Sequence, residues 1–250
     1  MPLPNLTPWD WTLAALAAAG IGIGKSGLSG FSLIQVTIFA SIFGPRQSLG
    51  FLLPLLIVGD ISAVTAFRRH ARWEYVRRLL PPAMIGIVAG WWLLDYLNDL
   101  AVKRMIGAIV LSLALLQGAR MLRPDWFNHL PHSRGFAWSL GFATGMATML
   151  ANGAGPIVAV YLIAVGLPKY EFVGTSAWFF LIANVFKVPF STQLGLIRPD
   201  TLMINLVLAP AVVIGLVVGK KIVQYVPQKL FDLLLLTFAA VAGLKMLGAF

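Results

Sequence analysis

The chain alternates between long apolar blocks and short polar segments. Six of the blocks approach the roughly 20 residues that an α-helix needs to cross about 30 Å of hydrocarbon. They cover residues 46–67, 75–95, 99–122, 169–192, 198–219 and 227–249. This pattern predicts an all-α polytopic membrane protein in which these six blocks are transmembrane helices.

Two further apolar regions are interrupted near their middle. The Gly- and Ser-rich segment 24–30 divides the first, and segment 151–156, with two glycines and a proline, divides the second. Their four arms, residues 9–23, 31–43, 136–150 and 156–166, have 11–15 residues each, or roughly 17–22 Å, which is too short to span a bilayer. Irregular backbone at membrane depth is tolerated where protein buries it or where it lines a cavity. We therefore expect two broken re-entrant helix hairpins; the alternative is a kinked, continuous helix at each place.

The composition agrees with a membrane protein. Of the 250 residues, 59% are hydrophobic and 11% are charged, and the mean hydropathy is +0.85. Soluble domains have about 25% charged residues, so ordinary soluble enzymes and disordered proteins are excluded. The chain has no cysteine, which excludes disulfides, zinc–thiolate sites and cysteine nucleophiles.

The basic residues indicate an orientation in the membrane. Nineteen Lys and Arg against nine Asp and Glu give a net charge of +10, and most of the basic residues lie between apolar blocks. This is typical of cytoplasmic loops and not of nucleic-acid binding. Lys25 and Lys187 lie within apolar regions and are left out of the count. If both interrupted regions return to the side they enter, the other basic residues divide twelve to five between the two sides, whereas full crossings give ten to seven. The sharper division favours hairpins, with both termini outside and residues 68–78 and 120–134 in the cytoplasm.

The two halves of the chain resemble each other. Gly50 and Asp60 are ten residues apart, as are Gly174 and Asn184, and other Gly and Pro matches follow at nearly the same offset. Each half would hold one hairpin and three spans, so the second copy must be inverted relative to the first. Inverted repeats with broken helices are typical of secondary transporters with a site near the bilayer midplane. We expect a first half at 1–122, a cytoplasmic linker at 123–134 and a second half at 135–250.

The two breaks are candidates for an anion-binding site. A half-helix that begins at membrane depth points its unpaired N–H groups and positive dipole end into the protein, and inverted hairpins would direct two such ends at one place. Glycine lets the backbone approach a ligand closely, and polar side chains would add donors. The candidate substrate-binding residues are Gly27, Gly30, Gly153 and Gly155 with Ser26, Ser29 and Asn152. Helix packing through small residues is the alternative role of the glycines.

Three ionisable residues lie deep in apolar regions. Lys25 lies in the first break, where a cation costs about 2.5–3.5 kcal/mol on insertion scales; we expect it to contact the anion, and solvation near the interface is the alternative. Asp60 and Lys187 occupy equivalent spans, with Asn184 at the position that matches Asp60. Either Asp60 and Lys187 form a buried pair, or Asp60 is the proton-coupling site while Asn184 and Lys187 contact the anion.

Two hydroxyl residues complete the candidate substrate site. Thr175 and Ser176 follow the second hairpin and would contribute donors to the anion. The alternative is that their hydroxyls bond to the backbone of their own helix.

Several of these motifs resemble one family. The second half carries Gly141-x3-Gly145, Asn152-Gly153-Ala154-Gly155-Pro156, Gly166-Leu167-Pro168, Gly174-Thr175-Ser176 and Asn184-x2-Lys187-x-Pro189, and the first half carries Gly22-x-Gly24-x2-Gly27-x2-Gly30 and Gly44-Pro45. The chain is similar to the sulfite exporter TauE/SafE family over nearly its whole length. The resemblance implies a transporter of the bacterial-type plasma (inner) membrane that moves small anions such as sulfite or organosulfonates, usually outward.

The expected partners are a small anion (sulfite, a sulfonate or a carboxylate), the lipid bilayer and a coupling proton. No cofactor, metal ion or nucleic acid is expected, and the shortage of deep ionisable residues argues against an enzyme. The alternative function is a passive anion channel of the same architecture, which would show faster, uncoupled flux.

Overall fold

The computed structural model describes residues 6–27, 31–123 and 133–222, with isolated residues and short stretches between 237 and 248. Helices make up nearly all of this part of the chain, which confirms the all-α class. The elements are α1 (Pro8–Lys25), α2 (Phe31–Phe43), α3 (Pro45–Phe67), η1 (Arg68–His70), α4 (Trp73–Tyr96), α5 (Asp99–Leu122), α7 (Arg134–Ala151), α8 (Gly155–Ala164), α9 (Lys169–Gln193) and α10 (Pro199–Ile222).

Five of the six expected spans form helices. Among the described residues, four helical segments are long and apolar enough to cross a membrane, namely α3 continued by η1, α4, α9 and α10. The expected span 99–122 is the 24-residue helix α5. The sixth, 227–249, lies for the most part outside the described residues, as do residues 124–132 of the expected linker.

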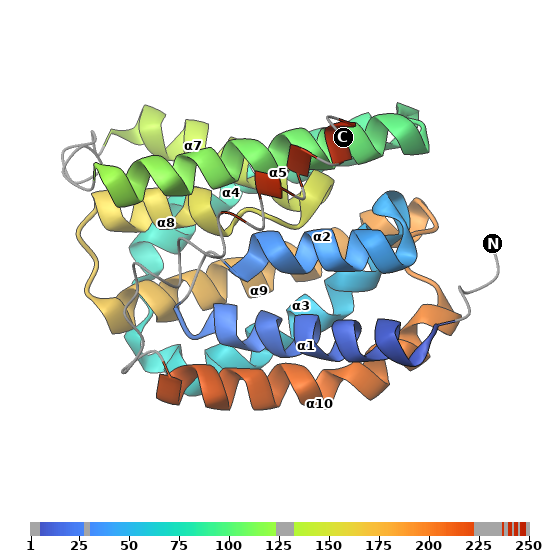
Figure 1. The fold of residues 1–250 in the computed structure, drawn as a ribbon. Coiled ribbons are helices and arrows are strands. Elements are labelled where there is room, and N and C mark those ends of the chain that lie inside the picture. The colour runs from blue at the N-terminus through green and yellow to red at the C-terminus, as the bar shows by residue number, and fades with distance from the viewer. Residues whose placement is uncertain are drawn as a thin grey trace.

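Both interrupted regions are broken where the sequence predicts. Helix α1 ends at Lys25 and α2 begins at Phe31, while α7 ends at Ala151 and α8 begins at Gly155. Figure 1 shows that α2 turns back beside α1 and that α8 turns back toward the end of the molecule where α7 begins. Each break is therefore a reversal of chain direction and not a kink.

The first arm of each broken pair is longer than expected. Both α1 and α7 have 18 residues, roughly 27 Å, whereas α2 has 13 and α8 has 10. Polar caps explain the extension at the N-terminal ends, and at the other end α1 runs on to Lys25 and α7 to Ala151. Thr7 and Asp10 form a capping box before the apolar stretch of α1, and the Ser133 side chain accepts from the Phe136 N–H at the start of α7.

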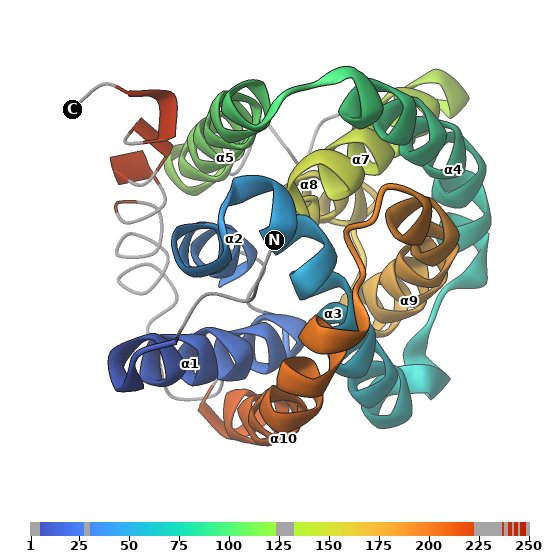
Figure 2. The same ribbon diagram turned by 90° about the vertical axis from the view of Figure 1, so that its right-hand side faces the viewer.

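The helices that contain the breaks pack against helices from the opposite half of the chain. Helix α1 lies along α10 and α7 lies along α4, while α3 and α9 pack together between them (Figure 2). Glycine permits the closest approaches. A Cβ on Gly22 would lie 1.9 Å from the Val212 carbonyl oxygen, and one on Gly145 would lie 2.0 Å from that of Ala83. Both broken pairs are thus held by equivalent backbone contacts.

Candidate functional site

A cavity lies where the two breaks meet. Its empty volume, the open side included, is about 720 Å³. It is lined by the end of α1, the start of α2, the end of α7, the start of α8, and faces of α3 and α9. The lining residues are Ile21, Gly24, Lys25, Gly27, Ser32, Gln35, Leu56, Thr148, Asn152, Gly155, Val158, Ala159, Phe172, Ser176, Ala177, Phe180 and Asn184.

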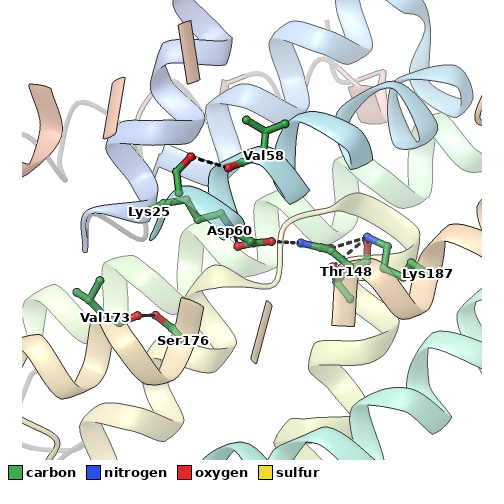
Figure 3. A network of polar contacts seen from close by, with 9 residues as sticks. Lys25, Val58, Asp60, Thr148, Val173, Ser176 and Lys187 are labelled. Carbon is green, nitrogen blue, oxygen red and sulfur yellow. Dashed lines mark hydrogen bonds and ion pairs between the residues drawn. The ribbon is translucent and has the colours of Figure 1, made fainter. Parts of the chain in front are cut away.

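Lys25 brings a cation to this cavity from the last turn of α1. Its ammonium group forms an ion pair with Asp60 of α3 (Figure 3). It also lies 4.6 Å from the centre of the Phe180 ring. The Lys25 side chain keeps 15% of its surface exposed, whereas Asp60 is fully buried. A lysine at the C-terminal end of a helix also opposes the negative end of the helix dipole.

The partner of Asp60 is not the one in the buried Asp60–Lys187 pair, which was one of the two alternatives from the sequence. Asp60 pairs with Lys25 and not directly with Lys187. The reason is that Asn184 occupies the space between the two residues. Its Nδ2 donates to Asp60 Oδ2 at 2.7 Å, and its Oδ1 lies 3.3 Å from Lys187 Nζ. The amide therefore links the two charged groups in one continuous network.

Lys187 is 1% exposed and contacts neutral oxygen atoms. Its Nζ donates to Thr148 O at 2.8 Å, to Thr148 Oγ1 at 3.2 Å and to Asn152 Oδ1 at 2.6 Å, in addition to the Asn184 contact (Figure 3). Within the described residues, Lys187 has no ion pair with an acid. Counted with their usual charges, the ionisable groups of the network are two cations and one anion, a formal net charge of +1.

Asn152 fixes the turn between α7 and α8. Its backbone is in the left-handed region, with φ 52°, which asparagine tolerates better than most residues. The side chain accepts from Lys187 and its Nδ2 donates to Leu49 O of α3 at 2.9 Å. These bonds join the break to α3 and α9, so the wall of the cavity is built from both halves of the chain.

The comparison with known families agrees with this arrangement. The profile of the sulfite exporter TauE/SafE family matches residues 13–246. The chain belongs to this family. The resemblance predicted from the motifs is therefore confirmed, and with its long apolar helices the chain is a multi-pass membrane protein of a transporter family. No curated protein matches the chain in a direct search.

Helix ends of opposite polarity meet at the cavity of this TauE/SafE chain. Helix α8 begins at Gly155, which lines the cavity, and no side chain caps its N-terminus. The positive end of α8 is thus directed at the site. The negative ends of α1 and α7 are each met by a lysine, Lys25 in one case and Lys187 at Thr148 O in the other. The lysines thus offset these two negative ends, and the N-terminus of α8 is the helix end that would attract an anion.

The residues predicted to bind substrate divide into three groups. Those that line the cavity are Lys25, Gly27, Asn152, Gly155, Ser176 and Asn184, and those that lie behind or beside it are Ser26, Gly153, Thr175 and Lys187. Ser29 and Gly30 fall outside the described residues.

Three of the predicted hydroxyl groups already have hydrogen-bond partners within the protein. The Thr175 hydroxyl accepts from the Arg72 N–H at 2.9 Å, which ties the loop after η1 to α9. Ser26 and Ser176 donate to Ile23 O at 2.7 Å and Val173 O at 3.0 Å, the backbone alternative considered for Ser176.

Sequence reasoning missed several lining residues, of which Ser32, Gln35 and Thr148 are polar. Gln35 is 3% exposed, and its Nε2 has no hydrogen-bond partner among the described residues. A lone glutamine in the apolar stretch 31–43 was a signal that could have identified it. The apolar lining residues, such as Phe172 and Phe180, carry no such signal because their sequence surroundings are equally apolar.

Proposed function

We propose that this chain is a secondary transporter that exports a small oxyanion such as sulfite or an organosulfonate. The anion binds in the cavity between the two breaks. The observation that carries this proposal is the charge of the network, in which Lys25 and Lys187 share a single acid, Asp60. An uncompensated cation is costly in a membrane interior, and a bound anion would neutralise it.

In the proposed binding site, one lysine contacts the anion directly and a second lysine attracts it from a short distance. Lys25 lines the cavity and reaches the anion itself, while Lys187 acts from behind the wall formed by Asn152 and Thr148. The apolar part of the lining, which includes Phe172, Phe180 and Val158, suits an apolar substituent on the anion. Such division into a polar head region and an apolar region is common in small-molecule sites.

The proposed mechanism is alternating access between inverted halves, residues 1–122 and 135–250. Two features support it. The contact of Gly22 with Val212 has its counterpart in that of Gly145 with Ala83, and Asp60 meets its repeat-equivalent Asn184 at the centre. In this proposal both hairpins are re-entrant in the inner membrane, with the termini outside and residues 68–78 and 120–134 in the cytoplasm. Rocking of one half against the other would expose the cavity to each side in turn.

A transport assay with purified protein in proteoliposomes tests this function. Sulfite, methanesulfonate, sulfate and acetate should be compared at equal concentration, with and without a proton gradient. The proposal predicts saturable flux of at least one anion and a response to the gradient. Fast, non-saturable flux would instead identify the passive channel, and no flux of any anion would overturn the proposal.

Asp60 is the proposed coupling residue. Protonation of its carboxylate would release Lys25, which would then be free to bind the anion. Asp60→Asn is therefore expected to abolish the response of anion flux to a pH gradient. Asp95→Asn, at an exposed acid near the end of α4, is the matched control and should respond like the wild type. An unchanged response in Asp60→Asn would assign Asp60 to a structural pair with Lys25.

A further inference from the structure

Gln35 carries an unused hydrogen-bond donor at the wall of the cavity. It lies in the second turn of α2, is 3% exposed, and lines the cavity at which Lys25 and Asn184 also lie. Its Nε2 has no partner among the described residues. The large majority of buried side-chain polar groups are paired, and leaving one unpaired is unfavourable. An unpaired donor at a cavity thus calls for an acceptor that enters the cavity.

The other amide donors of the cavity are already in use. Asn152 Nδ2 donates to Leu49 O and Asn184 Nδ2 donates to Asp60 Oδ2. Lys187 has three N–H donors and lies within 3.3 Å of four oxygen atoms. Lys25 already forms an ion pair with Asp60. Among the amides that line the cavity, Gln35 is therefore the one whose donor has no partner in the described part of the chain.

We propose that Gln35 is a substrate-binding residue whose Nε2 donates a hydrogen bond to an oxygen of the transported anion. This inference rests on the proposed function. A hydrogen bond to a charged acceptor is stronger than one between neutral groups. A neutral amide supplies that bond and orients the anion without adding another fixed charge, which would slow release of the anion. Lys25 and Gln35 together would hold two oxygens of one head group.

Calorimetric titration of purified protein with methanesulfonate and with sulfite tests the role of Gln35. Gln35→Leu removes the amide donor and puts an apolar side chain of similar size in its place. Gln35→Met also removes the donor, with an unbranched side chain like that of glutamine. The matched control is Gln117→Leu. Gln117, in α5, is 1% exposed, both atoms of its amide lack partners among the described residues, and it does not line the cavity.

The expected result is a loss of anion affinity of about tenfold or more in Gln35→Leu and Gln35→Met, with wild-type affinity in Gln117→Leu. Thermal unfolding gives a second readout. Without anion, both leucine variants should unfold at or above the wild-type temperature, because each loses an unpaired buried amide. Only the Gln35 variants should lose the rise in unfolding temperature that the anion produces.

Two results would contradict these expectations, and they can be distinguished. If the wild type binds an anion and the Gln35 variants bind it equally well, Gln35 does not contact the substrate and the proposed function stands. If the wild type binds neither methanesulfonate nor sulfite, the proposed function fails, and the role of Gln35 fails with it.

Discussion

The two breaks in this chain are alike in packing and differ in charge. The α1–α2 break carries its own cation, Lys25, which pairs with an acid on the following long helix, α3. The α7–α8 break carries neutral acceptors, Thr148 and Asn152, and receives its cation, Lys187, from the following long helix, α9. The first arrangement is a neutral pair and the second is a buried, uncompensated charge.

This difference assigns separate roles to the two lysines, one structural and one at the cavity. Lys187 is 1% exposed and surrounded by protein oxygens, so it holds the second break in shape and supplies charge from behind the wall. Lys25 is partly exposed at the cavity and, in the proposed mechanism, exchanges Asp60 for the anion. Loss of Lys187 should therefore reduce stability, whereas loss of the net positive charge at the cavity should reduce binding.

Lys187→Met is expected to have the largest effect on stability. It leaves Thr148 O, Asn152 Oδ1 and Asn184 Oδ1 without their common donor. Unpaired buried polar groups cost about 1–3 kcal/mol each, so we expect a loss of about 3 kcal/mol or more in the free energy of unfolding. Denaturant unfolding in detergent measures it. Lys103→Met, at an exposed lysine of α5, is the control, and a loss below about 1 kcal/mol in Lys187→Met would contradict the clamping role.

The glycine contacts should respond equally in the two halves. Gly22→Ala and Gly145→Ala each place a Cβ within about 2 Å of a backbone oxygen on the facing helix, which cannot rotate away. Overpacking of this kind typically costs about 1–3 kcal/mol, so we expect both variants to unfold at similarly reduced temperatures. Gly135→Ala, whose Cβ would meet only Ser133 Oγ at 3.9 Å, should lose no stability. Markedly unequal losses would show that the two contacts are not equivalent.

The sequence carries enough information to predict the helices and the breaks. Apolar length identified α3, α4, α5, α9 and α10, and the Gly-rich segments marked both reversals. It also identified Lys25, Asn152 and Asn184 as cavity residues, because polar groups are rare at membrane depth.

Side-chain partners could not be predicted in the same way. The choice of Lys25 over Lys187 as the partner of Asp60 depends on how α1, α3 and α9 are rotated relative to one another, which spacing along the chain does not determine. The burial of the Thr175 hydroxyl against the Arg72 N–H depends likewise on where the loop after η1 rests on α9. The N-terminal ends of α1 and α7 depend on capping by Thr7 and Ser133, which lie outside the apolar stretches.

One pair of variants at Asn152 tests most directly whether the uncompensated charge binds the anion. Asn152→Asp gives Lys187 a carboxylate partner and makes the network neutral, while Asn152→Gly keeps the left-handed turn and leaves the charge at +1. Both lose the bond to Leu49 O, and they differ in the charge at residue 152 and in whether Lys187 keeps a side-chain acceptor there. The titration should show methanesulfonate binding at least about tenfold weaker in Asn152→Asp than in Asn152→Gly. Equal affinities in the two variants would contradict an electrostatic basis for anion binding at this cavity.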